Sequence, residues 1–253
     1  MAEGILASKR ALITGGSSGM GEEIARQMAA AGAEVTVVGR SQDRLERVVG
    51  SIERHGGRGH LIVQDLTEEG AAPWVVGRAV ESMGSLSILA NVAGVFETGP
   101  FATTPIESFD RQMAINVRAA YALTQAALPY LRESGDASVL FISSMAALAA
   151  FPGAAAYSAT KGAIEAMARA LSVELAPQGV RVNVIAPGEI DTPMNTDLYK
   201  GHPEFVREME ALIPAGRLGV AADIAPVAVF LASDAARFIY GASIPVDGGY
   251  LAK

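Results

Sequence analysis

Residues 11–21 read ALITGGSSGMG, a short apolar run followed at once by a turn with glycine at four of its positions. The run predicts a buried strand, and the spacing of residues 22–31 predicts a helix directly after the turn. Glycines allow a tight turn and let a pyrophosphate approach the backbone, while the first turn of a helix offers free N–H groups and a partial positive charge. The stretch therefore predicts a strand–turn–helix unit that binds a dinucleotide.

Short runs rich in Val, Ile and Leu recur along the chain without strict alternation, as in strands that are buried on both faces. We expect strands at residues 11–14, 34–39, 59–64, 86–91, 138–143, 181–186 and 243–246. Segments with helical spacing lie between most of them, as at residues 22–31, 43–54 and 163–175. The sequence therefore predicts a single Rossmann-type, doubly wound α/β domain over residues 1–253. Its sheet should have seven mostly or wholly parallel strands, with helices on both faces.

One long section, residues 192–222, has no strand signal. It contains Pro193, Pro203 and Pro214, and it is apolar in places. Long segments of this kind in a compact domain often cover a functional site. We therefore expect this section to form a lid over the substrate.

The composition of the chain excludes several classes of binding partner and of catalytic chemistry. The chain has 253 residues, a net charge of -7 and no cysteine. The charge argues against a broad basic face for nucleic acid, and the lack of cysteine excludes thiolate chemistry. The three histidines are scattered, so we expect no metal site.

The longest apolar run, residues 145–151, is too short to span a membrane. The N-terminus does not resemble a signal peptide, so we expect a cytoplasmic protein without a membrane partner.

The stretch AAAYSATKG, residues 154–162, carries Tyr157 and Lys161 four residues apart, and such residues share one face of a helix. A phenol has a pKa of ~10, which makes it a poor base near neutral pH. An ammonium held about 4 Å away is worth ~4 kcal/mol at an effective dielectric near 20, or roughly 3 pKa units. We therefore expect Lys161 to lower the pKa of Tyr157 into a useful range for proton transfer.

The glycine spacing, T-G-x-x-x-G-x-G over residues 14–21, resembles that of the short-chain dehydrogenase/reductase family, and the likeness extends over essentially the whole chain. The resemblance implies a hydride transfer between a nicotinamide cofactor and a carbonyl or secondary alcohol. Tyr157 would be the general acid or base, and Lys161 would also bind the nicotinamide ribose. Ser144, thirteen residues before the tyrosine, would hold the substrate oxygen, and Asn116 would complete a proton relay.

The resemblance also implies a set of cofactor-binding residues. Val92 departs from the family pattern N-N-A-G. The neighbouring residues Asn91, Ala93 and Gly94 are therefore assigned to the cofactor one by one, and the motif is not taken as a whole. The expected set is Gly15, Ser17, Ser18, Gly19, Met20, Gly21, Arg40, Ser41, Asp65, Leu66, Asn91, Ala93, Gly94, Tyr157, Lys161, Pro187, Gly188, Ile190 and Thr192.

Arg40 directs the choice of cofactor. An acidic residue near the end of the second strand binds the ribose 2′-hydroxyl of NAD. Here the strand ends in Gly39 and Arg40. A guanidinium can form two hydrogen bonds with a 2′-phosphate, and the resemblance links a basic residue at this position with NADP. We therefore favour NADP(H) over NAD(H).

The substrate is expected to be a small carbonyl compound or secondary alcohol, largely apolar or cyclic. Expected pocket residues are Phe96, Glu97, Met145, Phe151, Glu189, Met194 and Tyr199. Alternatives are an NAD-dependent secondary-alcohol dehydrogenase and a 3-oxoacyl-thioester reductase of fatty-acid type. Val173 stands where an arginine is expected for a carrier protein, which argues against the thioester. A non-catalytic dinucleotide sensor or scaffold is the alternative of a different class. The resemblance implies a homotetramer or homodimer.

Overall fold

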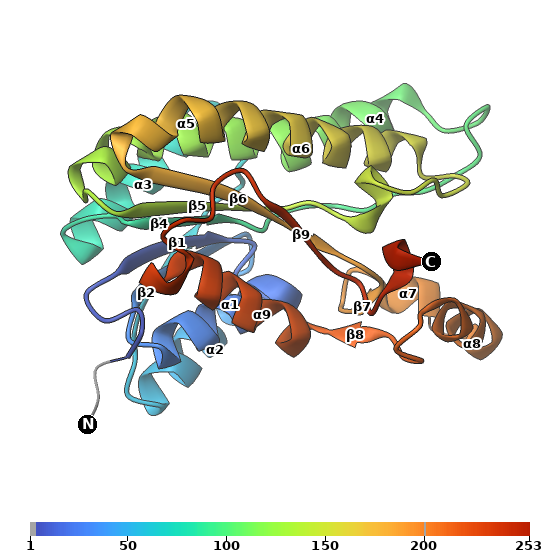
Figure 1. The fold of residues 1–253 in the computed structure, drawn as a ribbon, viewed down its shortest axis with the longest axis horizontal. Coiled ribbons are helices and arrows are strands. Elements are labelled where there is room, and N and C mark those ends of the chain that lie inside the picture. Colours follow the sequence, from blue (N-terminus) through green and yellow to red (C-terminus); the bar gives the residue numbers. More distant parts are fainter. Residues whose placement is uncertain (1–3, 200) are drawn as a thin grey trace.

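A seven-stranded sheet forms the centre of the protein in the computed structural model, which describes residues 4–199 and 201–253 (Figure 1). The strand order is β3-β2-β1-β4-β5-β6-β9, and every neighbouring pair is parallel. The strands are β1 (Arg10–Thr14), β2 (Glu34–Gly39), β3 (Arg58–Val63), β4 (Ile88–Asn91), β5 (Ala137–Ile142), β6 (Val180–Pro187) and β9 (Ser243–Val246). The expected parallel Rossmann-like sheet is confirmed.

Helices cover both faces of the sheet, as Figure 1 shows. On one face lie α1 (Gly19–Ala30), α2 (Gln42–Arg54) and α9 (Ala221–Ala232). On the other lie α3 (Ala71–Met83), α5 (Ala119–Glu133) and α6 (Ala155–Leu175). In β5, Leu140 packs into the first layer, whereas Val139 and Phe141 pack into the second. Two buried faces explain why the strands are apolar throughout, and burial of this apolar surface is the main term that favours folding.

The order of strands reverses between β1 and β4. The chain moves outward from β1 to β3 and then returns to place β4 on the free side of β1. In doubly wound sheets, ligands bind in the crevice at this switch point, outside the carboxyl ends of the strands. The turn after β1 and the segment after β4 meet here, because the Thr14 hydroxyl accepts hydrogen bonds from the backbone N–H groups of Val92 and Ala93, each at 3.0 Å.

A π-helical turn, Ala114–Arg118, joins α4 (Ile106–Met113) to α5. Such turns carry one residue more than a regular helix and are frequent at functional sites. Short 3₁₀ turns occur at Met145–Ala147, Ala176–Gln178, Asp234–Ala236 and Tyr250–Ala252.

The section after β6 contains α7 (Thr196–Tyr199) and α8 (Pro203–Leu212), which stand at one end of the molecule in Figure 1. It also contains two strands of two residues each, β7 (Ile190–Asp191) and β8 (Gly219–Val220), which pair in parallel. The sequence did not predict this pair, because two residues show no periodicity. Residues 1–3 of the expected domain and residue 200 of the expected lid lie outside the described residues. None of the described helices combines the length and the apolar character needed to cross a bilayer.

Candidate active site

Two adjoining cavities lie along the carboxyl edge of the sheet. The first, here called the turn cavity, has a volume of about 240 Å³ and lies beside the glycine turn, residues 15–21. The second, the tyrosine cavity, has a volume of about 380 Å³ and lies around Tyr157. The residues that line both are Met20, Val92, Gly94, Val95, Thr192 and Met194. The two cavities can therefore hold the two ends of one extended ligand.

Close backbone packing shapes the glycine turn. Gly15 has φ +67, and a Cβ on it would lie 2.9 Å from the Cα of Ala93. A Cβ on Gly21 would lie 2.3 Å from the carbonyl oxygen of Gly15, far inside van der Waals contact. Only glycine fits these two positions, because the turn folds directly onto the first residues of α1 and onto the segment after β4. The turn thus presents its backbone and the start of α1 to the turn cavity.

Most residues that the sequence assigned to the cofactor line one of the cavities. Those on the turn cavity are Gly15, Ser17, Ser18, Gly19, Met20, Gly21, Arg40, Ser41, Asp65, Leu66, Ala93, Gly94 and Thr192. Those on the tyrosine cavity include Tyr157, Lys161, Pro187, Gly188 and Ile190. Asn91 is the exception, because it is buried at the end of β4 and donates a hydrogen bond to Thr124 at 3.2 Å. It lines neither cavity, so its expected contact with the cofactor is not supported.

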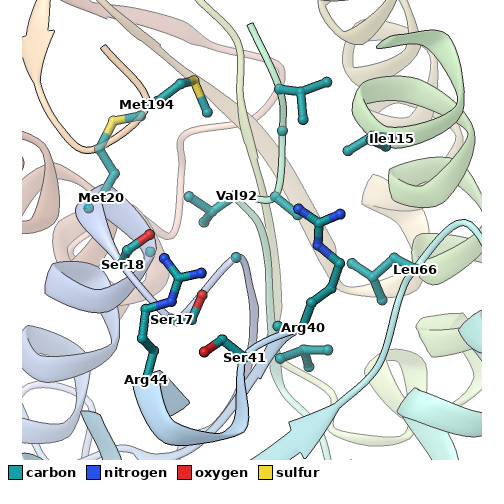
Figure 2. A pocket seen from close by; sticks show the side chains of 18 of the residues that line it. Ser17, Ser18, Met20, Arg40, Ser41, Arg44, Leu66, Val92, Ile115 and Met194 are labelled. Atoms are coloured by element: carbon teal, nitrogen blue, oxygen red, sulfur yellow. The ribbon is translucent and has the colours of Figure 1, made fainter. Parts of the chain in front are cut away.

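Two arginines stand at the entrance of the turn cavity. Figure 2 shows Arg40 and Arg44 reaching into it, with the hydroxyl groups of Ser17 and Ser41 between them. The Arg40 side chain is 73% exposed, and its guanidinium is 4.0 Å from the carboxylate of Asp65. Arg44 was not predicted from the sequence, although a second basic residue four positions after Arg40, at the start of a helix, could have indicated it. The pair forms a positive site where the sequence predicted one arginine.

Asp65 is the only acidic residue on the described lining of the turn cavity. Its carboxylate accepts hydrogen bonds from the backbone N–H of Thr67 at 2.9 Å and from the Thr67 hydroxyl at 2.7 Å. These bonds, and then the charge of Arg40, lower the pKa of Asp65. Asp65 is therefore an anion that also fixes the turn after β3.

Tyr157 and Lys161 project from α6 into the tyrosine cavity. Burial raises the pKa of Tyr157 to about 12, the Glu189 carboxylate adds to this rise, and the Ser144 hydroxyl opposes it. The ring of Phe96 packs edge-on against the phenol ring, with the centroids 4.7 Å apart. The cavity thus favours the neutral phenol, which can donate a proton.

Lys161 is only 5% exposed, and its ammonium donates a hydrogen bond to the carbonyl of Ile142 at 2.9 Å. Burial lowers the pKa of Lys161 to about 8. Its Nζ is 5.5 Å from the centroid of the Tyr157 ring. We expected the lysine to lower the pKa of the phenol, and in this structure that expectation is wrong. Loss of solvent is the largest cause of the shift at Tyr157 and the cause of the shift at Lys161.

The titration of Lys161 should appear in the stability of the protein. The folded pKa is about 8 and the ordinary value is 10.5, so between these pH values the unfolded chain binds a proton that the folded chain does not. The free energy of unfolding should therefore rise with pH across this window, by on the order of 3 kcal/mol relative to Lys161→Met, which has no group to titrate. Denaturant unfolding of both proteins across this pH range measures the difference. A constant difference would show that folding leaves the lysine pKa unchanged.

Ser144 and Asn116 lie close to this pair. Ser144 follows β5, lines the tyrosine cavity and accepts a hydrogen bond from the backbone N–H of Ala146 at 3.1 Å. Asn116 sits in the π-helical turn and is 2% exposed. Its side chain accepts a hydrogen bond from the N–H of Val95 at 2.8 Å and donates to the carbonyl of Val95 at 3.0 Å and to Thr160 at 3.1 Å. Asn116 thus holds the segment after β4 against α6.

Five of the seven expected pocket residues line the tyrosine cavity. Those that line the tyrosine cavity are Phe96, Met145, Phe151, Glu189 and Met194. Tyr199 does not line it, but its hydroxyl donates a hydrogen bond to the carboxylate of Glu189. Apolar residues that the sequence analysis did not name also line it, among them Val95, Pro152, Phe205 and Met209. The last two belong to α8, in the section predicted as a lid.

The expectation that Glu97 lines the substrate pocket is wrong. Its carboxylate forms an ion pair with Arg111 at 2.6 Å and accepts a hydrogen bond from Ser108, also at 2.6 Å. The bonds from Arg111 and then Ser108 lower the pKa of Glu97 to about 2. These partners hold the side chain at a separate surface hollow beside α4, away from the tyrosine cavity. Among the described residues, no group of three or more His, Asp or Glu side chains could hold a metal ion.

Known proteins resemble the chain over nearly its whole length. Residues 15–251 match the family model described as enoyl-(acyl carrier protein) reductase. The 2,5-dichloro-2,5-cyclohexadiene-1,4-diol dehydrogenase of Sphingobium indicum is 39% identical, over 97% of both chains. The cyclopentanol dehydrogenase of Comamonas testosteroni is 34% identical, over 97% of this chain and 98% of the relative.

A solved structure from Beutenbergia cavernae superposes with a TM-score of 0.93 at 34% identity, over 98% of both chains. It is provisionally described as an NAD(P)-dependent gluconate 5-dehydrogenase with NADP bound at low occupancy. Both curated relatives are named as dehydrogenases of alcohols, and each matches 97% of the present chain. The chain thus belongs to the short-chain dehydrogenase/reductase family, as an NAD(P)-dependent dehydrogenase of alcohol or carbonyl substrates.

Proposed function

We propose that this enzyme transfers a hydride between NADP(H) and a small, largely apolar cyclic ketone or secondary alcohol, with Tyr157 as the general acid or base. One observation carries the proposal: an apolar cavity that contains Tyr157, Lys161 and Ser144 adjoins a second cavity with two arginines at its entrance. The two cyclic alcohols in the names of the curated relatives support a ring-shaped substrate.

The residues present fit a phosphorylated dinucleotide. The turn cavity offers the glycine backbone and the N-terminus of α1 to a pyrophosphate. Arg40 and Arg44 would hold a 2′-phosphate, with Ser17 and Ser41 as hydroxyl donors. When bound, the nicotinamide supplies or accepts the hydride.

The residues of the tyrosine cavity move and orient the proton. In the direction of reduction, Tyr157 Oη donates its proton to the carbonyl oxygen, while Ser144 holds that oxygen in place. In the direction of oxidation, the phenolate accepts the proton of the alcohol. Lys161 would hold the nicotinamide ribose, and Asn116 positions the segment after β4 beside it.

We also propose that residues 192–222 act as a lid within a single domain. Thr192 and Met194 contribute to both cavities, and Phe205 and Met209 of α8 close the apolar side of the tyrosine cavity. A homotetramer or homodimer fits the large apolar side chains left on the surface, among them Phe238 at 96% and Phe101 at 85% exposed.

Cofactor titration tests the proposal. NADPH should bind the purified protein at least about tenfold more tightly than NADH, as followed by nicotinamide fluorescence. Arg40→Ala and Arg44→Ala should each reduce this preference, and the double variant should abolish it, because both remove a partner of the 2′-phosphate. Arg47→Ala, an exposed arginine of α2 outside the cavity, is the matched control and should retain the preference. Equal binding of NADH by the wild-type protein would contradict the proposed cofactor and favour an NAD-dependent alcohol dehydrogenase.

A further inference from the structure

A single acidic side chain interrupts the apolar wall of the tyrosine cavity. Among the described residues that line it, Glu189 is the only one with a carboxyl group and Lys161 the only one with a basic side chain. Most of the remaining lining is apolar, including Phe96, Phe151 and Phe205. A carboxylate in apolar surroundings is unfavourable unless it is hydrogen-bonded. The hydrogen bonds that the Glu189 carboxylate makes, and those it leaves open, therefore indicate which ligand groups the cavity can bind.

One carboxylate oxygen of Glu189 is held firmly in place. Its Oε1 accepts hydrogen bonds from the Tyr199 hydroxyl and from the Asn195 amide, the latter at 3.1 Å. The same Asn195 amide also donates to the carbonyl of Ile190 at 3.1 Å, which ties it to β7. The Tyr199 ring stacks on Phe205, with the centroids 6.4 Å apart. The bond to Ile190 holds Asn195 and the stack on Phe205 holds Tyr199, so the carboxylate has a defined orientation.

Among the described residues, the hydrogen bonds of the Glu189 carboxylate all go to Oε1, and the second oxygen, Oε2, has no hydrogen-bond partner. It is not one of the sealed, unpartnered polar atoms of the described core, and Glu189 itself lines the tyrosine cavity. Burial raises the pKa of Glu189, while the hydrogen bond from Tyr199 opposes that rise. An oriented acceptor with one oxygen left unpartnered by the described residues suits a ligand that brings a donor.

We propose that Glu189 binds a second hydroxyl group of the substrate, so that the enzyme prefers a cyclic diol to a simple cyclic alcohol. This inference rests on the proposed function and adds a specificity-determining residue to it. The buried ammonium of Lys161 lines the same cavity, and it disfavours a second cation there, so a hydroxyl suits the site better than an amine. A relative that is 39% identical is named for a cyclic 1,4-diol, which agrees with this choice.

Paired substrates test the inference. Cyclohexanol, the 1,2- and 1,4-cyclohexanediols and 4-aminocyclohexanol would be compared under saturating cofactor. The best diol should exceed cyclohexanol in kcat/KM by about tenfold to a hundredfold, which is the range expected for a hydrogen bond to a charged group. Glu189→Leu should remove this advantage, so that the diol and cyclohexanol have similar kcat/KM values in that variant, whatever the change in overall rate. Glu189→Gln should keep part of it, because an amide oxygen still accepts a hydrogen bond. Tyr199→Phe should raise KM for the diol more than it changes kcat, because it frees the carboxylate without removing it.

Glu97→Gln is the matched control, since it changes the acid that lies outside the cavity, and it should leave the selectivity unaltered. The inference is overturned if Glu189→Leu and Glu189→Gln lower the diol and cyclohexanol equally, or if the amine is the best substrate of the wild-type enzyme.

Ligand binding to the Tyr157→Phe variant tests the role of Glu189 independently of catalysis, so failure of this inference can be distinguished from failure of the proposed function. Calorimetry on that variant, with cofactor present, should show tighter binding of the diol than of cyclohexanol, and Glu189→Leu in the same background should erase the difference. Turnover of no alcohol or ketone by the wild-type enzyme would reject the proposed function, and the calorimetric difference would still decide the role of Glu189. Equal binding of the two ligands would reject that role.

Discussion

Replacement of Tyr157 by phenylalanine should lower kcat by about 10³-fold, within the range of 10²- to 10⁴-fold for the loss of a general acid or base. The change removes one oxygen and keeps the ring, so the edge-on packing against Phe96 should persist. NADPH should then bind within about twofold of the wild-type affinity, because the turn cavity is untouched. Steady-state kinetics with a cyclic alcohol and a fluorescence titration of the cofactor measure the two effects.

Tyr121→Phe is the matched control for this experiment. Tyr121 lies on α5, is 53% exposed and lines neither cavity, so its loss should leave both kcat and cofactor binding unchanged. A Tyr157→Phe enzyme that retained most of its activity would refute the proposed proton transfer. A cellular role that survives the loss of activity in Tyr157→Phe would instead favour a dinucleotide-binding sensor or scaffold.

The second large effect is expected at Gly21. Alanine at this position should lower the free energy of unfolding by on the order of 3 kcal/mol and weaken cofactor binding by more than about tenfold. The added Cβ would lie 2.3 Å from the carbonyl oxygen of Gly15, and neither backbone can yield without moving the turn. Denaturant unfolding and NADPH titration measure the two effects.

Gly77→Ala gives the contrasting result. Gly77 lies inside α3, and a Cβ there would have no neighbour within 4 Å. The same substitution should therefore raise the free energy of unfolding by roughly 0.5–1 kcal/mol, because alanine is the better helix former. Equal effects at the two glycines would show that helix propensity, and not the close approach at Gly21, determines the outcome.

Much of the fold could be predicted from local patterns. The expected strands at residues 34–39 and 243–246 coincide with β2 and β9, because both are short apolar runs bounded by turn residues. The parallel pairing followed from the alternation of strands with helices. The pair β7–β8 could not be predicted, since residues about 30 positions apart meet there through contacts that no local pattern records.

The candidate site was predictable to the extent that it depends on spacing. The turn glycines, Ser144, Tyr157 and Lys161 lie where their motifs indicated. The direction in which Glu97 points depends on Arg111, fourteen residues away on another element, and no motif indicated that pairing. The upward shift in the pKa of Tyr157 likewise depends on how much protein surrounds the phenol, which spacing does not reveal.

The π-helical turn at Ala114–Arg118 divides one long helix into two halves with different rotational phases. One residue advances a helix by about 100°, so a single extra residue rotates everything on one side of it relative to the other. Before this turn, Ser108 and Gln112 face the segment that follows Gly94, and after it Leu123 and Leu131 face the sheet. Each half can therefore satisfy its own neighbours. Deletion of one residue at the turn would restore a regular helix. The same deletion would turn Asn116 away from Val95 and Thr160. The site therefore requires the irregular turn.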